Sequence, residues 1–430
     1  MARNNVLLEN KFILYGMGVS NKSVKNFFDK HNIDYIIVEE DYEVTNDYII
    51  VEEDYEVTND YIVIKSPGIS NDTVFLNRCK KFGIKVINDI ELYFLLNREV
   101  KYIGITGTCG KTTTATLLYN IMKDKYKVLI CGNIGIPIFD TYDKDFEYLI
   151  VELSSYQLEY INEFKPKYFI ILNIFHHHLN HHKTYKNYFH CKCKPILNMS
   201  ENDYLIINKT CTSYLEGWKI KCKTFTFSND LRADVNIIDN IISFKQHRFD
   251  CSNIKYFNYE FNKLNFLSIF VLIQLLNINN YVSIIKAFDN LEHRMELIIN
   301  NKDLIVINDS KSTCLSALIE AYKYCIKNYT DYKLIIIMGG KLDLEEFNNY
   351  INDLKLLKCA DVYCYGENKD LIFNFINCKV YLTLEQVIEN LKLDYPCVIL
   401  FSPGAQSLDQ FSSYIQRGEV FKKLVINKFK

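Results

Sequence analysis

The sequence lacks an excess of charge of either sign. Its 50 lysine and arginine residues stand against 52 aspartate and glutamate residues, a formal net charge of −2. A globally positive field that would hold a nucleic-acid backbone or an anionic membrane is therefore excluded. We expect no nucleic-acid partner, and any anionic ligand must be bound by a local group of residues. Glycine and proline are scarce too, at 15 and 6 residues, a bias that indicates no function.

Long apolar runs are also missing. The longest, Phe266 to Leu276, is interrupted by Ser268 and Gln274 and is much shorter than the ~20 residues of a membrane-spanning helix. The opening residues MARNNVLLENKF contain too short an apolar stretch for a secretion signal. The 14 cysteines are dispersed, which is typical of reduced thiols rather than of a disulfide framework. We therefore expect a cytoplasmic protein without membrane insertion. We also expect a monomer.

The length is sufficient for several domains. At roughly 150 residues per domain, 430 residues give about three. One tandem repeat is present: the 13 residues DYIIVEEDYEVTN occupy 34–46 and recur at 47–59. A solenoid needs about three or more repeats of 20 or more residues, so we interpret this repeat as a local insertion that adds one strand-like segment.

Short runs of β-branched and aromatic residues alternate with helical periodicity along the chain. This pattern is typical of α/β folds in which helices cover a mainly parallel sheet. Ligands of such sheets bind beyond the carboxyl ends of the strands, so the loops there are where we expect chemistry. We place domain boundaries near residues 98 and 290. The clearest predicted strands are 12–15, 61–64, 101–105, 148–151, 168–172, 304–307, 334–338, 361–365 and 397–401.

The sharpest local signal is the segment YIGITGTCGKTTTATLLYNIM at 102–122. It predicts a strand, a glycine turn from Gly107 to Lys111 and a helix that opens with three threonines. Glycines let backbone N–H groups approach phosphate oxygens, the helix N-terminus and the lysine add positive charge, and a threonine hydroxyl can bind Mg²⁺. The segment departs from the strict G-x-x-x-x-G-K-[ST] pattern, because Ile105 stands five residues before Gly110. We interpret it as a nucleotide-phosphate site; the alternative is a bare glycine turn that caps a helix.

Two further segments offer metal ligands. Glu152 ends a predicted strand in YLIVELSSYQLE and is a candidate ligand of the same Mg²⁺, although a lone residue of this kind more often caps a helix. Five histidines in NIFHHHLNHH could suggest zinc, but five in seven residues cannot all reach one ion, so a single metal ligand is the better hypothesis. Cys191 and Cys193 form a C-x-C without a second pair, a weak metal signal. The five histidines are His176, His177, His178, His181 and His182.

Other loops at predicted strand ends suit anionic ligands. ILYGMGVSNKSV places Gly16 and Gly18 in half of a dinucleotide fingerprint, with Asn21 at the third glycine position, and SPGI at 66–69 follows another strand. In the last third, INDSKST and LFSPGAQSLDQF place a lysine and several hydroxyls after two strands, which suits a small carboxylate substrate. Taken singly, each of these segments can be a solvated loop.

Ten short segments follow one another along the chain: GMG, SPGI, NDIELYF, TGTCGKTT, GNIGIP, VELSSYQLE, HLNHH, LEHRME, NDSKST and SPGAQSLDQF. In this order they resemble the Mur ligase family over nearly the whole chain. The resemblance implies an α/β fold of three domains: a Rossmann-like domain for a UDP sugar at 1–98, a central P-loop-type ATPase domain at 99–290, and a Rossmann-like amino-acid-binding domain at 291–430. NDSKST and SPGAQSLDQF favour the D-glutamate-adding members of the family.

The resemblance implies an ATP-dependent ligase of peptidoglycan synthesis. ATP would phosphorylate the carboxylate of UDP-N-acetylmuramoyl-L-alanine, and the amine of D-glutamate would attack the acyl phosphate, which splits one hard step into two easier ones. The implied cofactors are ATP and Mg²⁺ at two sites, and the implied partners are these two small substrates. The alternatives are a Mur-type or folylpolyglutamate-synthase-like ligase that uses another amino acid, and a nucleotide-binding homologue that has lost catalysis.

The same resemblance implies catalytic and binding roles for the residues of this chain that match the motifs of the family. The implied catalytic residues are Lys111, His178 and Lys192, of which Lys192 stands where the family has a carbamylated lysine. A carbamate forms on a neutral amine, so the site must lower the pKa of that lysine. The implied metal ligands are Thr112, Glu152, His178 and carbamylated Lys192. The implied ATP contacts are Thr108, Cys109, Gly110, Lys111, Thr112, Thr113, Thr114, Asn262, Asn265, His293, Arg294 and Asp309. The implied UDP-substrate contacts are Gly16, Ser66, Gly68, Asn133, Ser154 and Gln157, and those of D-glutamate are Lys311, Thr313, Ser407, Leu408 and Tyr414.

Several positions depart from the family pattern. His177 stands where the family usually has Asn or Asp, and Asn180 stands where it usually has Asp. Both changes leave less negative charge around the second metal. Tyr259 and Phe261 stand where the family has a glycine and a histidine, which changes the packing expected for adenine. The repeat at 34–59 leaves the uracil contacts unassigned.

Overall fold

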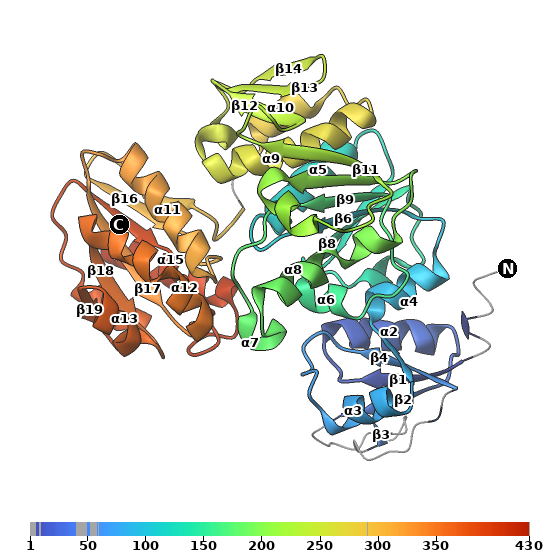
Figure 1. Ribbon diagram of the computed structural model, residues 1–430. Helices are drawn as coiled ribbons and strands as arrows, with labels where there is room; N and C mark the ends of the chain where they lie inside the picture. The colour runs from blue at the N-terminus through green and yellow to red at the C-terminus, as the bar shows by residue number, and fades with distance from the viewer. Residues whose placement is uncertain are drawn as a thin grey trace. The chain divides into compact units, whose positions relative to one another are not determined.

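The computed structural model describes residues 6–7, 10–39, 50–51, 58, 60–289 and 291–429. They form three β-sheets with helices on their faces (Figure 1). The predicted α/β class with mainly parallel sheets is confirmed, whereas the boundaries near residues 98 and 290 stay predictions. The chain divides into two compact units: unit 1 comprises Met1–Ile174, Phe189–Asn253 and Lys263–Lys286, and unit 2 comprises Phe175–Tyr188, Ile254–Asn262 and Ala287–Lys430.

The first sheet is parallel throughout and belongs to unit 1. Side chains of β1 alternate between its faces: Tyr15 packs on Phe75 of α3, with ring centroids 4.7 Å apart, and Phe12 packs on Phe28 of α2 at 4.9 Å. Two helices therefore cover opposite faces (Figure 1). Across the sheet the strands are β3 (Ile50–Val51), β2 (Tyr35–Val38), β1 (Lys11–Tyr15), β4 (Tyr61–Lys65) and β5 (Lys85–Ile87); the helices are α2 (Val19–Lys30), α3 (Val74–Lys81) and α4 (Asp89–Leu96).

The tandem repeat supplies two neighbouring strands of this sheet. The first copy gives β2 and the second gives β3, and the two pair in parallel, Ile37 with Ile50 and Val38 with Val51. Because both pairs are 13 positions apart, equivalent residues of the two copies lie side by side. β3 is the edge strand. The interpretation that the repeat adds one strand is confirmed; most other residues of 39–59 lie outside the described residues.

The second sheet places β6 between β8 and β9, and its last three strands turn antiparallel. Asp239 and Asn240, with φ of 47° and 61°, form the turn between β12 and β13. Across the sheet the strands are β14 (His247–Asp250), β13 (Ile241–Phe244), β12 (Val235–Ile238), β11 (Lys223–Ser228), β10 (Tyr204–Asn208), β9 (Tyr168–Ile171), β6 (Lys101–Thr106), β8 (Tyr148–Leu153) and β7 (Val128–Gly132). The helices along this stretch are α5 (Lys111–Met122), α6 (Ser155–Glu159), α7 (Leu179–His182), α8 (Tyr185–Cys193), α9 (Glu260–Leu275) and α10 (Tyr281–Ala287).

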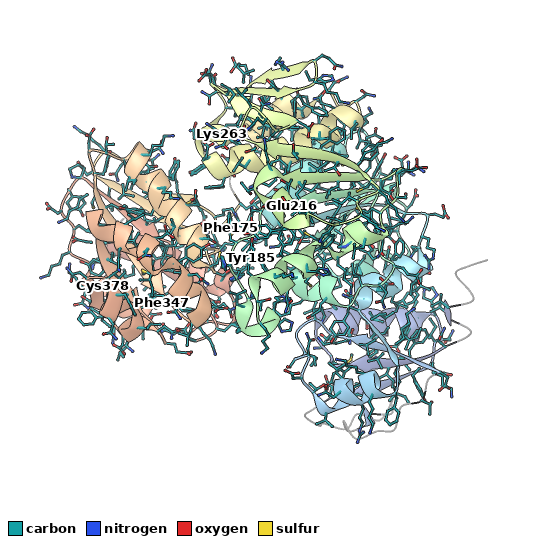
Figure 2. All side chains as sticks on the ribbon, in the orientation of Figure 1. Phe175, Tyr185, Glu216, Lys263, Phe347 and Cys378 are labelled. Atoms are coloured by element: carbon teal, nitrogen blue, oxygen red, sulfur yellow. The ribbon has the colours of Figure 1, made fainter. Side chains whose placement is uncertain are left out.

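The third sheet belongs to unit 2 and has an apolar core on each face. Phe347 and Cys378, labelled in Figure 2, belong to one core, and Phe421 and Val425 of α15 belong to the other. Only β15 is antiparallel to its neighbour among the described strands of this sheet. The strands are β15 (Glu296–Asn300), β16 (Leu304–Asn308), β20 (Cys397–Phe401), β17 (Lys333–Gly339), β18 (Ala360–Tyr365) and β19 (Cys378–Val380); the helices are α11 (Leu315–Asn328), α12 (Leu344–Leu354), α13 (Lys369–Phe375), α14 (Leu384–Asn390) and α15 (Tyr414–Phe429).

All nine strands predicted from the sequence are observed, and their ends differ from the prediction by at most two residues. Their side chains are almost entirely buried, as expected of parallel strands covered on both faces. None of the described helices combines the length and the apolarity needed to cross a membrane.

Candidate active site

The predicted glycine turn joins β6 to α5. Gly110 precedes the helix with φ of 88°, a left-handed conformation that favours glycine. A Cβ atom at this position would lie 2.4 Å from Oδ1 of Asn265, so a side chain has no room. Lys111 folds back over the turn, and its Nζ donates to the carbonyl oxygens of Gly107 at 2.8 Å and Thr108 at 3.0 Å. The turn therefore has the backbone freedom and the local positive charge that a phosphate site needs.

Asn173, a residue that the sequence did not single out, holds this turn in shape. It follows β9, and its carbonyl oxygen accepts the backbone N–H of Thr108 at 2.9 Å. Its side-chain Oδ1 accepts the N–H of Cys109 at 2.9 Å, and its Nδ2 donates to the Cys109 carbonyl at 3.1 Å. A single asparagine in a loop gives no signal in a sequence, because only the third dimension brings it to its partners.

Glu152 lies beside the turn on the neighbouring strand, where it pairs with Ile105 of β6. Its side chain is only 2% exposed. Oε1 accepts a hydrogen bond from Nδ2 of Asn133 at 3.1 Å, and Oε2 is buried with no hydrogen-bond partner among the described residues. A buried carboxylate oxygen without a partner is costly, whereas carboxylate and hydroxyl oxygens are ligands that Mg²⁺ prefers. Glu152, with the hydroxyl of Thr112 in the first turn of α5, therefore fits a Mg²⁺ ion.

Lys192 of α8 approaches the same turn and is 2% exposed. Its Nζ lies 3.0 Å from the carbonyl oxygen of Gly107, the acceptor that Lys111 also uses. Burial, reinforced by the positive charge of Lys111, holds the pKa of Lys192 well below its ordinary value. The environment thus favours a neutral amine, which is the condition that the sequence analysis set for a carbamate.

Other buried polar atoms lie at positions predicted to contact ATP. Nδ2 of Asn265, beside Gly110, has no hydrogen-bond partner among the described residues, and the same holds for Oγ1 of Thr113. In unit 2, Nε of Arg294 is likewise buried without a partner in the described part of the chain. Thr114 differs, because its hydroxyl donates to the carbonyl of Gly110 at 2.9 Å within the helix. A buried donor without a partner, as Asn265 has in unit 1 and Arg294 has in unit 2, suits a ligand with hydrogen-bond acceptors.

Two more predicted ATP residues bond within unit 2. Nδ2 of Asn262 donates to the carbonyl of Tyr256 at 2.9 Å. Asp309 follows β16; its Oδ1 accepts the N–H of Met295 at 3.2 Å and its Oδ2 accepts the hydroxyl of Ser402 at 2.9 Å. The carboxylate of Asp309 therefore joins the loops that follow β16 and β20.

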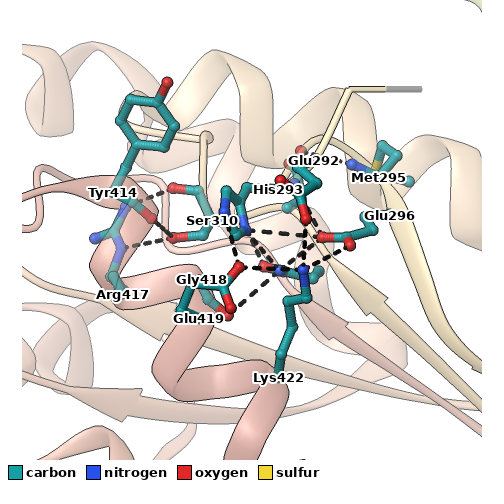
Figure 3. A network of polar contacts seen from close by, with 12 residues as sticks. Glu292, His293, Met295, Glu296, Ser310, Tyr414, Arg417, Gly418, Glu419 and Lys422 are labelled. Carbon is teal, nitrogen blue, oxygen red and sulfur yellow. Dashed lines mark hydrogen bonds and ion pairs between the residues drawn. The ribbon is translucent and has the colours of Figure 1, made fainter. Parts of the chain in front are cut away.

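The imidazole of His293 is buried within unit 2, at 3% exposure (Figure 3). Its Nδ1 lies 3.0 Å from Nδ2 of Asn308, and its Nε2 lies 3.5 Å from Oε1 of Glu419. A Cβ atom at Gly418 would lie 2.3 Å from the ring, so the ring packs directly on α15. Its carbonyl oxygen accepts the N–H of Lys311 at 2.9 Å. The side chain is thus engaged inside the C-terminal unit, and its backbone helps to shape the loop after β16.

The two N-terminal turns predicted to hold the UDP substrate pack together. A Cβ atom at Gly16 would lie 2.6 Å from Cγ1 of Ile69, and one at Gly18 would lie 2.5 Å from Oγ of Ser66. Asn21, at the third glycine position of the fingerprint, is fully buried, and its Nδ2 donates to three backbone carbonyls within 3.1 Å. Asn21, in the first turn of α2, therefore ties the start of this helix to the turn after β1 and to β4.

The remaining predicted contacts of the UDP substrate are more varied. Ser154 and Gln157 bond to each other at the start of α6: the N–H of Gln157 donates to Ser154 Oγ at 3.2 Å, and the N–H of Ser154 donates to Gln157 Oε1 at 3.0 Å. These two bonds form a capping box at the start of α6, so the structure of the helix alone explains why the Ser154 and Gln157 side chains lie here. Asn133 is bonded to Glu152, and Gly68 has open space where a Cβ would stand.

Four of the predicted D-glutamate residues lie on the loops after β16 and β20, strands that pair directly, and the fifth, Tyr414, is the first residue of α15. Nζ of Lys311 stands 5.2 Å from the ring centroid of Tyr414, a cation–π distance. Ser407 is buried, Thr313 is half-buried, and Leu408 is 64% exposed. The ammonium group of Lys311 and the hydroxyls of Thr313 and Ser407 thus lie on loops at the carboxyl-terminal ends of two neighbouring strands of the third sheet.

Known proteins resemble this chain over most of its length. Residues 105–287 match the Mur ligase middle domain. The UDP-N-acetylmuramoylalanine--D-glutamate ligase of Buchnera aphidicola subsp. Acyrthosiphon pisum (strain Tuc7) is 33% identical to the chain over 445 residues, which cover 96% of the chain and 97% of the relative. The protein of the same name from Clostridioides difficile (strain 630) is 31% identical over 393 residues, 85% of the chain and 84% of the relative. The chain belongs to the Mur ligase family.

Solved structures share its fold. UDP-N-acetylmuramate-alanine ligase MurC from Thermotoga maritima aligns with a TM-score of 0.60 at 16% identity, over 97% of the chain and 99% of that structure. MurF ligase from Thermotoga maritima, in complex with ADP, aligns with a TM-score of 0.61 at 16% identity, over 98% of the chain and 99% of that structure. As a Mur ligase, the chain is an ATP-dependent enzyme that forms amide bonds.

The residues that depart from the Mur ligase pattern have their own partners here. Tyr259 is buried and stacks on Tyr324 of α11, with centroids 4.2 Å apart and planes at 25°. Phe261 packs on the same core of the third sheet. The large rings that replace a glycine and a histidine therefore bind the start of α9 to the C-terminal core.

The histidine-rich segment lies in unit 2, between Phe175 and Tyr185 of Figure 2. Its rings pair with different neighbours: His176 with Tyr185 at 4.4 Å, and His177 with His178 at 3.7 Å between centroids. These pairings do not decide how many metal ligands the segment supplies, and a single metal ligand stays a prediction.

The two cysteines of the C-x-C pair are buried. The thiol of Cys191 donates to the carbonyl of Ser155 at 3.0 Å. Burial raises the pKa of Cys191 to about 12. Cys193 is buried as well, so packing alone explains this weak signal of the sequence.

Proposed function

We propose that this chain joins D-glutamate to UDP-N-acetylmuramoyl-L-alanine at the expense of ATP, through an acyl phosphate. The observation that carries the phosphoryl-transfer part is the turn at 107–111, where two lysines meet one carbonyl oxygen beside the unpaired oxygen of Glu152. The names of the relatives and the loops NDSKST and SPGAQSLDQF support the choice of D-glutamate.

The backbone of the turn would hold the phosphates of ATP. Lys111 would leave the carbonyls of Gly107 and Thr108 to contact the transferred phosphoryl group, because a phosphate oxygen is a stronger acceptor than a carbonyl. Thr112 and Glu152 would hold a Mg²⁺ ion, which neutralises phosphate charge when bound. Phosphorylation turns a poor leaving group into a good one, so the amine can displace it.

A carbamate on Lys192 would place a negative charge beside Lys111. The buried amine, whose pKa is lowered, would react with CO₂ in its neutral form and lose a proton, and the product is an anion next to the cation of Lys111. Its oxygens would serve a second Mg²⁺, for which His178 is the other proposed ligand.

The amino-acid side of the reaction would use the loops of the third sheet. D-glutamate carries two carboxylates, which bind to a cation and to hydroxyl groups that donate hydrogen bonds. Lys311 supplies the cation, Thr313 and Ser407 supply hydroxyls, and Tyr414 backs the lysine with its ring. The exposed Leu408 would shield the bound substrate.

The UDP-sugar would bind at the paired turns of Gly16 and Ser66, with Asn133 near the reacting end. We further propose that the three sheets correspond to three domains with the boundaries given above. The reaction would be a cytoplasmic step of cell-wall precursor synthesis, since its phosphoryl donor is ATP.

Product analysis by mass tests this proposal. The protein is incubated with ATP, Mg²⁺, UDP-N-acetylmuramoyl-L-alanine and D-glutamate, and the expected product is heavier than the nucleotide substrate by one glutamyl residue. Matched reactions replace D-glutamate by L-glutamate, L-alanine, L-lysine or diaminopimelate. A product with one of those instead overturns the choice of amino acid, and ATP binding without any product overturns the proposed activity.

A further inference from the structure

Arg417 of α15 has a fully buried side chain, at 0% exposure. Its Nε donates to the hydroxyl of Ser310 at 3.1 Å, its Nη2 to the carbonyl of Ser310 at 2.8 Å, and its Nη1 to the carbonyl of Ala405 at 2.9 Å. Figure 3 shows the guanidinium facing Ser310. Burying a charged group is costly unless its donors are satisfied, so these bonds are what keeps the side chain in place.

The three bonds reach two different loops. Ser310 belongs to NDSKST after β16 and directly precedes Lys311, whereas Ala405 belongs to SPGAQSLDQF after β20 and stands two residues before Ser407. One planar group therefore fixes the backbone of both loops at points next to the two residues proposed to bind the amino acid. Three N–H groups in a rigid fork define direction as well as distance, which a flexible ammonium cannot do.

A third loop packs against the same group. Gly340 follows β17, and a Cβ atom there would lie 3.3 Å from Nη1 of Arg417 and 2.4 Å from the carbonyl oxygen of Gln406. Lys341 and Gln406 exchange two backbone hydrogen bonds of 2.9 and 3.0 Å. The helix α15 is held to the first loop as well, because the hydroxyl of Ser310 donates to the carbonyl of Tyr414 at 2.8 Å. Arg417 is thus the point at which the loops after three neighbouring strands are joined.

We propose that Arg417 is a positioning residue for the amino-acid substrate: through Ser310 and Ala405 it sets the spacing between Lys311 and Ser407. The proposal rests on the proposed function, since it takes these two residues as the amino-acid site. Arg417 does not touch the substrate; its effect passes through the backbone of the two loops.

Steady-state kinetics of Arg417→Lys tests the proposal. The lysine keeps the positive charge but lacks the planar guanidinium group. At least one of the three hydrogen bonds to Ser310 and Ala405 is therefore lost. We expect the KM of D-glutamate to rise about tenfold or more, while the KM values of ATP and the UDP substrate change less than about twofold. Lys423→Ala, an exposed position on the same helix, is the matched control and is expected to behave as wild type.

Chemical rescue separates positioning from general stability. In Arg417→Ala, added guanidinium ion is expected to lower the KM of D-glutamate toward the wild-type value, and methylammonium at equal concentration is expected to have no effect. Should Arg417→Ala fail to fold, Ser310→Ala removes one acceptor while the arginine stays, and a smaller rise in the same KM is expected.

Two results overturn the proposal. One is a folded Arg417→Lys enzyme with an unchanged KM for D-glutamate. The other is an equal rise in all three KM values together with a lower melting temperature, which indicates a loosened domain. If the wild-type enzyme uses a different amino acid, the proposed function fails, whereas the KM of that amino acid tests the role of Arg417 in the same way.

Discussion

Nζ of Lys192 lies 3.0 Å from the carbonyl oxygen of Gly107, which Nζ of Lys111 also contacts at 2.8 Å. Two lysines from different helices therefore share one acceptor, and burial together with the positive charge of Lys111 lowers the pKa of Lys192. A carbamate formed on the neutral amine of Lys192 would place an anion beside the cation of Lys111, which links the phosphate turn to the proposed modification.

Lys192→Ala is expected to be nearly inactive and to regain part of its activity with acetate, a small carboxylate that can occupy the place of a carbamate. Lys194→Ala is the control, because Lys194 is a partly buried lysine two residues away that donates to the carbonyl of Glu159. A ¹³C NMR carbamate signal after incubation with labelled bicarbonate is expected in the wild type and absent in Lys192→Ala. Full activity of that variant without any supplement would contradict the carbamate.

Lys111→Met is expected to lower turnover by ~10²–10³, because one preorganised charge at a transition state has an effect of this size. Lys123→Met, an exposed lysine at the other end of the same helix, serves as the control. The rates are measured by phosphate release in the complete reaction. A Lys111→Met enzyme that keeps half the wild-type rate removes the phosphate assignment of the turn.

Cys109 is expected to react first with iodoacetamide. The structure describes the side chains of thirteen cysteines, none of which forms a disulfide, and Cys109 is the one among these thirteen that is not buried. Its place in the phosphate turn means that bound ATP covers it, so MgATP is expected to slow the first alkylation. Peptide mapping by mass identifies the modified residue, and AMP at the same concentration is the control. Labelling that begins at another of these cysteines, or is indifferent to MgATP, speaks against the assigned site.

Deletion of residues 47–59 is expected to leave a folded, active enzyme. The deletion removes the edge strand β3 and keeps β2, which carries the identical sequence and pairs with β1. Shortening a loop costs little in closure entropy, so the melting temperature is expected to change by only a few degrees. Size-exclusion chromatography and the activity assay measure the outcome. Insoluble protein would mean that β3 is needed to close the sheet.

Much of the fold is local in the sequence, and those parts were predictable. The apolar run of 397–401 is buried on both sides, so its composition alone predicted β20 within the observed bounds. The hairpin of β12 and β13 was missed, because its short strands are half exposed and its turn depends on the positive φ of Asp239 and Asn240 rather than on glycine.

Site residues that act through long-range contacts could not be found in this way. Asn173 reaches the turn at Cys109 from 64 positions away, and Arg417 reaches Ser310 from 107 positions away. The partner of His293 is Gly418, a glycine whose missing side chain makes room for the ring. Neither a lone asparagine, nor a helical arginine, nor a helical glycine carries a pattern that predicts such a role.

The stability of unit 1 is expected to depend on pH through Asp89. This residue opens α4, is buried, and has one carboxylate oxygen, Oδ1, without a hydrogen-bond partner among the described residues. Burial raises the pKa of Asp89 to about 6, above the ~3.9 of an unfolded chain. The folded state therefore binds a proton more tightly than the unfolded state. The contribution of the protonated Asp89 side chain to the stability of the fold is therefore complete below about pH 4, and it is lost as the pH rises through 6.

Asp89→Asn removes this dependence, because an amide is neutral at every pH. The variant is expected to match the wild type near pH 4 and to exceed its free energy of unfolding by about 1 to 3 kcal/mol at pH 8. Urea unfolding at several pH values measures the difference, with Asp331→Asn, an exposed position, as the control. A difference between Asp89→Asn and wild type that is the same at pH 5 and pH 8 would show that Asp89 stays ionised in the folded protein.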